Sequence, residues 1–308
     1  MIEGSTEERN MTQKKALFFI NPSAGLGNAK NDLYTIVETL SVGGFEVTVI
    51  PVIPEHDLVP DRLLAETGST YDLIACYGGD GTLSHTMNGY LNAGLTCPFG
   101  YFPNGSTNDF AKSVGISFHV KENAEHMCEG HVFRYDVGRF NEQYFNYVAA
   151  FGAFTDISYN TPREAKRLMG HAAYVLNGLV SLPANLRTRC HVRITHDGQT
   201  SEGDYLYGGI SNATQVGGMK LPYKSISLDD GVFEVALIRN PDNPLELQQI
   251  AASLAIGTID SPYVEVFQTS ALEVEAFGEV PWTIDGEYGG APERVSVRIC
   301  PKAIPLLV

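Results

Sequence analysis

The sequence lacks the paired cysteines that hold a zinc ion or a disulfide framework. Its five cysteines are scattered along 308 residues, and no two of them form a CxxC pair. They are Cys76, Cys97, Cys128, Cys190 and Cys300. Scattered single cysteines are typical of proteins in a reducing compartment, so we expect a cytoplasmic location.

Long apolar runs are also missing. No stretch approaches the roughly 20 apolar residues that a membrane-spanning helix needs. The first residues, MIEGSTEERNMTQKK, are polar and acidic and do not contain the apolar core of a secretory signal peptide. We therefore interpret residues 1–13 as a disordered lead-in that takes no part in the fold.

Basic residues are scarce. Lys and Arg number 21 against 36 Asp and Glu, which gives a formal net charge of −15. A nucleic-acid binder needs basic patches to replace the counterions of the phosphates, so we expect no nucleic-acid partner. Hydrophobic residues make up 44% and charged residues 19%, which is the composition of a soluble globular protein.

The first half of the sequence alternates short apolar runs with amphipathic stretches at helical spacing. This alternation is typical of a parallel α/β sheet with helices on its faces. We expect strands at 16–20, 45–50, 72–77 and 99–102. The expected helices lie at 31–40, 61–66, 83–92 and 109–114.

Runs rich in Tyr, Phe, Val and Thr dominate after about residue 132 and predict a mainly antiparallel β-sandwich. The expected strands lie at 133–137, 144–151, 191–195, 204–211, 232–238, 263–267, 271–275 and 295–300. Two helices interrupt them, at 161–180 and 245–256. We therefore expect an α/β domain over 14–135 and a β-sandwich domain over 136–300.

The sharpest local feature is the sequence YGGDGTL at 77–83, between an expected buried strand and a helix. Glycines there let the main chain approach a ligand closely, and the helix N-terminus attracts an anion. Asp80 would repel a bare phosphate, so it fits a site in which Mg²⁺ stands between carboxylate and phosphate. A tight turn in which Asp80 caps the helix explains this loop, taken alone, equally well.

Two further loops follow strands of the first half. In NPSAGLG at 21–27, Gly25 and Gly27 match half of the dinucleotide fingerprint GxGxxG, but Lys30 takes the place of the third glycine. PNGSTND at 103–109 carries many side-chain donors, and an ordinary helix cap is its alternative interpretation. Ligands bind at the carboxyl ends of parallel strands, so three such loops on one edge favour a nucleotide site.

Two acidic turns stand out in the second half. LDDG at 228–231 is either a hairpin turn or a small cation site. Asp285 and Glu287 lie two residues apart, beside glycines and the only tryptophan. A carboxylate in such a place can accept the proton of a reacting hydroxyl, although a plain β-turn is the alternative.

Six motifs, spread in order over both halves, together resemble the diacylglycerol kinase catalytic-domain family, bacterial lipid kinases related to sphingosine kinases. They are NPSAG at 21–25, GGDGTL at 78–83, PNGSTNDF at 103–110, YDVG at 135–138, LDDG at 228–231 and DGEYGG at 285–290. The GGDGT motif alone is shared with NAD kinases and loosely with phosphofructokinases. The resemblance covers the chain from Lys14 to about Val308.

The resemblance implies an N-terminal α/β domain, with the parallel sheet of NAD kinases and phosphofructokinases, that binds ATP. A C-terminal β-sandwich would help to receive the lipid, with the active site in the cleft between the two domains. The last strand, 301–308, would rejoin the first domain. The implied nucleotide-binding residues are Asn21, Pro22, Ser23, Ala24, Gly25, Gly78, Gly79, Asp80, Gly81, Thr82, Leu83, Ser106, Asn108 and Asp109.

The resemblance also implies roles for the carboxylates. Asp80 would organise a catalytic Mg²⁺ through water, with Asp109 and Asp136 in the surrounding carboxylate network. Either Asp285 or Glu287 would be the catalytic base, and the sequence does not separate them.

A structural Mg²⁺ site is implied in the second domain. Asp230 would bind this ion together with the main-chain carbonyls of Ser227 and Val232.

The function expected from the resemblance is ATP- and Mg²⁺-dependent phosphorylation of the hydroxyl of diacylglycerol or a similar lipid, with transient contact to the membrane. An NAD kinase on the same scaffold is one alternative. The other is a lipid- or nucleotide-binding regulator that has lost catalysis. Leu26 and the pair Ser84-His85 favour the regulator, because relatives often have Lys and Asn-Glu at these positions. The sequence leaves the acceptor lipid and the oligomeric state, a homodimer included, undetermined.

Overall fold

The computed structural model of the chain describes residues 13–24, 29–153, 189–216, 219–221, 225–255 and 262–308. The helix expected at 161–180, Gly25 and Leu26 lie outside these described residues. Within them, 15 strands are hydrogen-bonded into one sheet, parallel in its N-terminal part and antiparallel in most of the rest.

Four parallel strands form the N-terminal part of the sheet, in the order β2-β1-β3-β4. They are β1 (Lys14–Ile20), β2 (Phe45–Pro51), β3 (Leu73–Gly78) and β4 (Phe99–Pro103). All residues of β3 are buried, because helices cover both faces of a parallel sheet. The expected α/β arrangement is confirmed, and the carboxyl ends of β1, β3 and β4 lie at one edge of the sheet.

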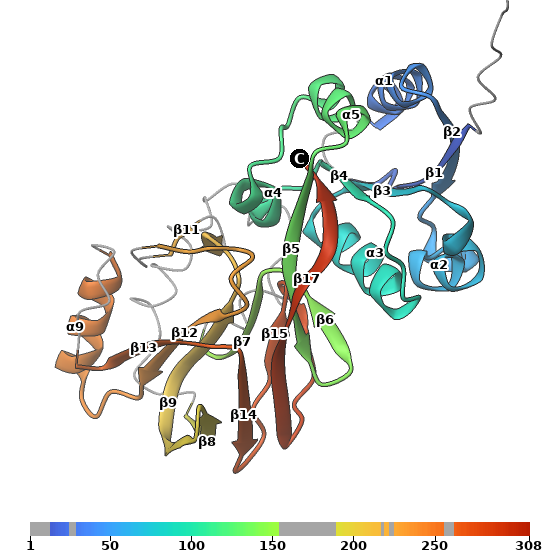
Figure 1. Ribbon diagram of the computed structural model, residues 1–308. Helices are drawn as coiled ribbons and strands as arrows, with labels where there is room; N and C mark the ends of the chain where they lie inside the picture. The colour runs from blue at the N-terminus through green and yellow to red at the C-terminus, as the bar shows by residue number, and fades with distance from the viewer. Residues whose placement is uncertain (1–12, 25–28, 154–188, 217–218, 222–224, 256–261) are drawn as a thin grey trace, which may run out of the picture.

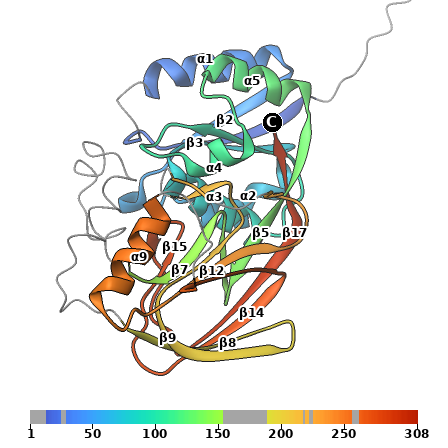
Figure 2. The same cartoon turned by 90° about the vertical axis from the view of Figure 1, so that its left-hand side faces the viewer.

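Helices form a layer on each face of this sheet (Figures 1 and 2). On one face, Ile36 of the first helix and Met127 of the fifth pack into a common apolar core. On the other face, Leu64, Met87 and Phe110 from three further helices belong to a second core. These helices are α1 (Ala29–Val42), α2 (Pro60–Thr67), α3 (Asp80–Asn92), α4 (Asp109–Val114) and α5 (Val120–Glu129), with short 3₁₀ turns at Pro54–His56 and Gly68–Thr70.

Helix α5 is absent from the helices expected above. Its apolar residues are nevertheless spaced at helical intervals and pack into one core; they are Val120, Ala124, Met127 and Cys128. Asn123 is accommodated in the core because its Nδ2 donates to the carbonyl of Tyr101 at 2.8 Å. The apolar spacing of 120–128 therefore carries a signal for this helix, and the polar Asn123 beside it does not remove that signal.

The second half folds into the expected β-sandwich. Its interior is built around Trp282, whose ring packs against Phe140 at 5.0 Å and Phe151 at 4.9 Å between centroids. The strands are β5 (Val132–Phe140), β6 (Gln143–Phe145), β7 (Val148–Gly152), β8 (Cys190–His196), β9 (Gln199–Ser211), β12 (Phe233–Arg239), β13 (Val264–Thr269), β14 (Ala271–Ala276), β15 (Trp282–Ile284), β16 (Glu287–Tyr288) and β17 (Arg294–Leu307). Beside them, β10 (Gln215–Val216) and β11 (Met219–Lys220) form a separate two-stranded antiparallel sheet.

The expected helix near 245–256 is present as α9 (Pro244–Ala255). It packs Ile250 against Ile238 of the neighbouring strand β12. Among the described residues, no helix is both long and apolar enough to cross a lipid bilayer.

Two long strands, β5 and β17, run side by side between the two halves (Figure 1). Leu306 of β17 pairs with Phe99 of β4, so the end of the chain joins the N-terminal sheet. The domain boundary expected near residue 135 falls inside β5. Continuous strands, and not a flexible linker, therefore connect the two halves.

The strand expected at 144–151 is wrong in one respect. The structure divides it into β6 and β7, which are separated by Asn146 and Tyr147. At this break the main-chain N–H groups turn toward the carboxylate of Asp285 and leave the regular strand pairing. The strand is therefore interrupted where its main chain binds Asp285, a residue distant in the sequence, and the local sequence pattern does not indicate this contact.

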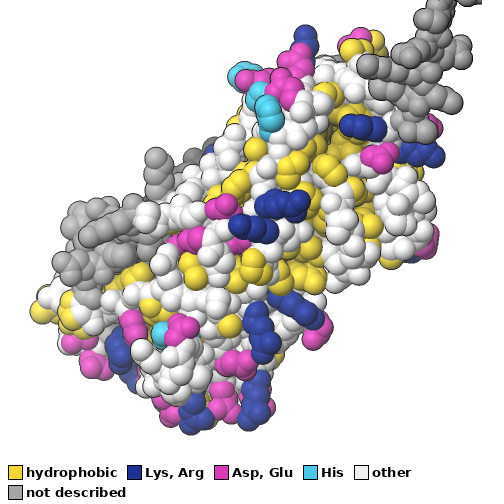
Figure 3. All heavy atoms as spheres, viewed as in Figure 1, with side chains coloured by type: hydrophobic (Ala, Val, Ile, Leu, Met, Phe, Trp, Pro, Cys, Tyr) yellow, Lys and Arg dark blue, Asp and Glu magenta, His cyan; other side chains and the backbone are white. Residues whose placement is uncertain are grey.

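Basic and acidic side chains are interleaved over the sandwich end of the face in Figure 3. Ion pairs on the sandwich strands include Arg193 with Glu202 and Glu275, both at 2.7 Å, and Arg294 with Glu275 at 3.0 Å. Exposed pairs of this kind contribute about 0–1 kcal/mol each. These charges are satisfied by each other and do not mark a binding site.

Candidate active site

Three loops meet at the carboxyl edge of β1, β3 and β4. The N–H of Asn21 donates to the carbonyl of Tyr77 at 3.0 Å, and the N–H of Asn104 donates to the carbonyl of Gly78 at 2.7 Å. Gly79 and Gly105 lie in direct contact, because a Cβ on Gly105 would stand 2.6 Å from the Cα of Gly79. The three loops expected to gather at this edge are thus packed together.

Polar side chains of these loops brace one loop against another. The Nδ2 of Asn21 donates to the hydroxyl of Thr82 at 2.9 Å, and its Oδ1 accepts the N–H of Ser23 at 3.0 Å. Asn108 has a left-handed backbone with φ of 51° and exchanges hydrogen bonds with both main-chain groups of Gly105. These side chains keep the loops in shape, so contacts to a ligand would come mainly from the main chain. The side chain of Ser106 is exposed.

Asp80 is the first residue of α3 and not its cap. The helix is capped by Gly79 without any side-chain hydrogen bond. The Asp80 carboxylate instead accepts the N–H groups of Asp109 and Phe110, at the start of α4. Its Oδ1 is buried and has no hydrogen-bond partner among the described residues. Burial, together with the nearby charge of Asp109, raises the pKa of Asp80 to about 6.

Asp109 connects this carboxylate to the second half of the chain. It is 2% exposed, and its Oδ1 accepts the Nε2 of Gln215 from β10 at 2.8 Å. The carboxylates that raise the pKa of Asp80 are Asp109 and Asp285, so both halves contribute to one acidic cluster.

Asp285 is tightly held at the turn between β15 and β16. Its backbone is left-handed, with φ of 49°, and the residue is 4% exposed. Its Oδ2 accepts the N–H of Asn146 at 2.7 Å, and its Oδ1 accepts those of Tyr147 and Val148 at 3.0 and 3.2 Å. The hydroxyl of Ser84 donates to Oδ2 at 3.2 Å. Burial nevertheless raises the pKa of Asp285 to about 6, because desolvation outweighs these donors.

Glu287, two residues further on, is exposed. Its Oε1 lies 3.7 Å from the place that a Cβ on Gly81 would occupy, so its carboxylate reaches the first turn of α3 beside Asp80. In the described part of the chain the Glu287 carboxylate makes no hydrogen bond or ion pair. The structure thus distinguishes two carboxylates that the sequence could not: the Asp285 carboxylate is held by hydrogen bonds, and the Glu287 carboxylate is not.

Asp136 supports the turn at 228–231. Its Oδ2 accepts the N–H of Gly231 at 2.7 Å, and its Oδ1 accepts the N–H of Lys302 at 2.6 Å. Both oxygens therefore accept hydrogen bonds from the main chain. A place for Asp136 in the carboxylate network around Asp80 stays a prediction.

The expected metal turn itself is in place, with two of its three residues accessible. Ser227 and Asp230 are exposed, and the N–H of Val232 donates to Asp230 Oδ1 at 3.2 Å. In the part of the chain that the structure describes, no three or more His, Cys, Asp or Glu side chains cluster as metal ligands. A site made of one carboxylate and two carbonyls stays a prediction.

Sequence reasoning missed the residues that hold Asp285, which are Ser84 and the main chain at 146–148. Ser84 carries a usable signal, because it stands four residues after Asp80 and therefore on the same face of α3. The donors at 146–148 carry no such signal, because they are main-chain N–H groups, which are present whatever the side chain is.

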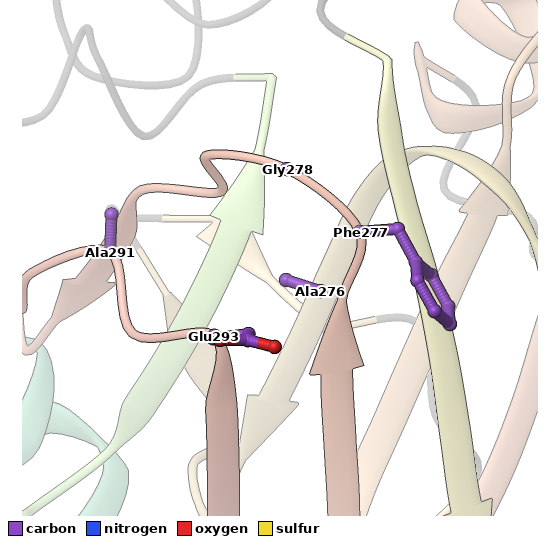
Figure 4. A pocket seen from close by; sticks show the side chains of 5 residues that line it. All are labelled: Ala276, Phe277, Gly278, Ala291 and Glu293. Atoms are coloured by element: carbon purple, nitrogen blue, oxygen red, sulfur yellow. The ribbon is translucent and has the colours of Figure 1, made fainter.

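A separate hollow of 410 Å³ lies at the edge of the sandwich (Figure 4). Ala276, Phe277, Gly278, Ala291 and Glu293 line it, on the two loops that follow β14 and β16. It offers one carboxylate and otherwise small or apolar groups. It lacks the convergent polar groups of the loop edge, so the site is assigned to that edge.

Two family models cover most of the chain. The diacylglycerol kinase catalytic domain matches residues 15–140, and the YegS C-terminal NAD kinase beta sandwich-like domain matches residues 153–308. The chain is 29% identical over 281 residues to a diacylglycerol kinase of Staphylococcus carnosus (strain TM300), covering 90% of each chain. It is also 29% identical to one of Staphylococcus aureus (strain MRSA252), covering 90% of this chain and 87% of that one.

Solved structures repeat the fold. A chain from Bacillus anthracis str. Sterne matches with a TM-score of 0.82 at 23% identity, covering 96% of both chains. A crystal structure of a diacylglycerol kinase from the same organism matches with a TM-score of 0.74 at 20% identity.

Proposed function

The chain belongs to the diacylglycerol kinase catalytic-domain family, with the YegS-type β-sandwich as its second half, and from this premise we propose that it is an ATP- and Mg²⁺-dependent lipid kinase. The acceptor would be the hydroxyl of diacylglycerol or a similar lipid. The single observation that carries the proposal is the acidic cluster at the loop edge. There Asp80, Asp109 and Asp285 approach one another, and Glu287 reaches the first turn of α3.

The loop edge suits a phosphate donor. Glycines bring main chain from two loops into contact, and the N-terminus of α3 opens onto the same place. The side chains of Asn21 and Asn108 stabilise these loops, which keeps the donor groups preorganised.

The acidic cluster fits Mg²⁺. Asp80 Oδ1 is a buried carboxylate oxygen without a partner among the described residues, and oxygens of this kind are what Mg²⁺ prefers. Asp80 would hold the ion, with Asp109 close by. When bound, Mg²⁺ neutralises charge on the phosphates during phosphoryl transfer.

We assign the catalytic base to Glu287. Both oxygens of Asp285 already accept hydrogen bonds, whereas the Glu287 carboxylate is exposed and unpaired in the described part of the chain. In the proposed step, the lipid oxygen bonds to the γ-phosphorus while the bond from that phosphorus to the β–γ bridging oxygen breaks. The hydroxyl proton passes to Glu287, and ADP leaves.

The test is transfer of radiolabelled phosphate from ATP, with Mg²⁺, to a panel of acceptors that contains diacylglycerol in detergent micelles, sphingosine and NAD. We expect label in phosphatidic acid. Glu287→Gln should lower the rate by about 10²–10⁴-fold. Glu293→Gln is the matched control, because Glu293 is an exposed glutamate of the same segment, and it should leave the rate unchanged.

Two outcomes would contradict the proposal. Label in NADP and not in lipid would favour the NAD kinase. Binding of ATP without label on any acceptor would favour the regulator.

A further inference from the structure

Three side chains on one face of α3 reach the second half of the chain or the acidic cluster. Asp80, Ser84 and Asn88 are spaced four residues apart, so they lie above one another along the helix. We call these residues the α3 stripe. Asp80 belongs to the proposed site, Ser84 holds Asp285, and Asn88 has not been described so far.

Ser84 connects the stripe to the turn that carries Glu287. Its hydroxyl donates to Asp285 Oδ2 at 3.2 Å, and the two residues are 201 positions apart in the sequence. Ser84 is 8% exposed and Asp285 is 4% exposed, so water competes little for this bond.

Asn88 connects the stripe to the segment that holds Asp285 from the other side. Its Oδ1 accepts the N–H of Tyr144 at 2.9 Å, and its Nδ2 donates to the carbonyl of Tyr144 at 2.9 Å. The same Nδ2 donates to the carbonyl of Ser84 at 3.0 Å. One amide thus fixes the main chain of β6 to the helix, in the way a neighbouring strand would.

The two connections meet at one place. Tyr144 is followed by the main-chain donors at 146–148, which bind the carboxylate of Asp285. Ser84 binds that carboxylate directly, and Asn88 sets the strand that supplies its other donors. The backbone of Asp285 is left-handed, which costs free energy that this network offsets.

We propose that Ser84 and Asn88 are positioning residues that place the Asp285–Glu287 turn against Asp80. The inference rests on the proposed function, because it concerns where the base stands relative to the phosphate side. Displacement of a reacting group by about 1 Å can cost about 10²-fold in rate, so a bond far from the chemistry can control the rate of transfer.

The test compares Ser84→Ala and Asn88→Ala with Thr86→Val. Thr86 is a matched control, because it is a fully buried hydroxyl of the same helix whose partners, the carbonyl of Thr82 and the thiol of Cys76 in β3, belong to neither 144–148 nor the Asp285–Glu287 turn. Ser84→Thr keeps the hydroxyl and tests rescue. We measure kcat and KM for ATP in the lipid assay, and amide hydrogen exchange of the peptides that contain 144–148 and 285–288.

Ser84→Ala and Asn88→Ala should each lower kcat about tenfold while KM for ATP changes less than about twofold. Exchange in both peptides should become about fivefold faster, since each variant loses a hydrogen bond that holds them. Thr86→Val should change neither quantity, and Ser84→Thr should restore kcat.

Unchanged exchange in both alanine variants would overturn the proposal, as would faster exchange with unchanged kcat. If the wild-type protein transfers phosphate to no lipid, the proposed function fails and the exchange result alone decides. Faster exchange would then still establish that the α3 stripe places this turn, and unchanged exchange would refute it.

Discussion

The two sides of the candidate active site are held together in different ways. On the side that we call the phosphate side, the loops after β1, β3 and β4 are joined by glycine contacts and side-chain hydrogen bonds, and Asp80 Oδ1 has no partner among the described residues. On the side that we call the acceptor side, the turn with Asp285 and Glu287, Asp285 accepts main-chain hydrogen bonds from a segment 137–139 residues away through both of its oxygens. A carboxylate oxygen that accepts no hydrogen bond from the protein can bind a metal ion or accept a proton. This difference supports the proposed chemical roles of Asp80 and Glu287 and a supporting role for Asp285.

The largest effect is expected from Asp80→Asn. This variant removes the charge that would hold Mg²⁺, so kcat should fall at least about 10³-fold. Thermal unfolding should show no loss of stability, because the removed charge is buried and disfavoured by desolvation. Steady-state kinetics and a melting curve check both statements. Activity within tenfold of wild type would show that Asp80 is not the ion's main ligand.

Asp285→Asn makes the same chemical change on the other side and should behave differently. An asparagine keeps one acceptor oxygen and turns an NH₂ group toward main-chain donors. The free energy of unfolding should therefore fall by about 2–4 kcal/mol, and kcat by about 10²-fold because the turn moves. Urea unfolding of the two Asn variants, side by side, measures the contrast. Equal stability of both would remove the distinction between the two sides.

Gly105→Ala should affect the phosphate side alone. A Cβ there would stand 2.6 Å from Gly79 Cα and 2.8 Å from Asn108 Oδ1, so the two loops must separate. We expect KM for ATP to rise about tenfold, with a smaller effect on kcat. Gly203→Ala is the control, because the atom nearest to its Cβ would be 4.0 Å away, on Tyr205. An equal loss of affinity in both variants would contradict the contact between the loops.

The smallest effect is a pH dependence of stability. The pKa of Asp80 is raised from 3.8 to about 6 in the folded protein, so the folded state binds more protons than the unfolded state between pH 4 and 6. The contribution of the Asp80 carboxyl to the free energy of unfolding is therefore fully present below pH 4 and is lost as the pH rises through 6.

The advantage of Asp80→Asn over wild type should accordingly grow by about 1 kcal/mol or more from pH 4.5 to pH 7. Urea unfolding at several pH values measures it. An advantage that shrinks with rising pH would mean that Asp80 is stabilised as a carboxylate and not penalised by burial.

The phosphate side could largely be predicted from the sequence. Its loops are contiguous, rich in glycine and placed after apolar strands, which is why Asn21, Gly79 and Asp109 stand out among the residues of the first half. Local sequence contains the whole of this signal, because the chain itself brings the ends of neighbouring parallel strands together.

The acceptor side could not be predicted in the same way. The division of labour between Asp285 and Glu287 depends on main-chain donors at 146–148, which no side chain reveals. Asp136 likewise accepts the N–H groups of Gly231 and Lys302, which are distant in the sequence. Long-range main-chain contacts of this kind leave no signal in the local sequence.

The most direct test of the account is the lipid kinase assay on Glu287→Gln and Asp285→Asn, combined with unfolding curves of the same samples. We predict that both variants lose most of the phosphate transfer to diacylglycerol, and that only Asp285→Asn is destabilised. Full activity of Glu287→Gln, with loss of activity in a fully stable Asp285→Asn, would contradict the account and make Asp285 the base.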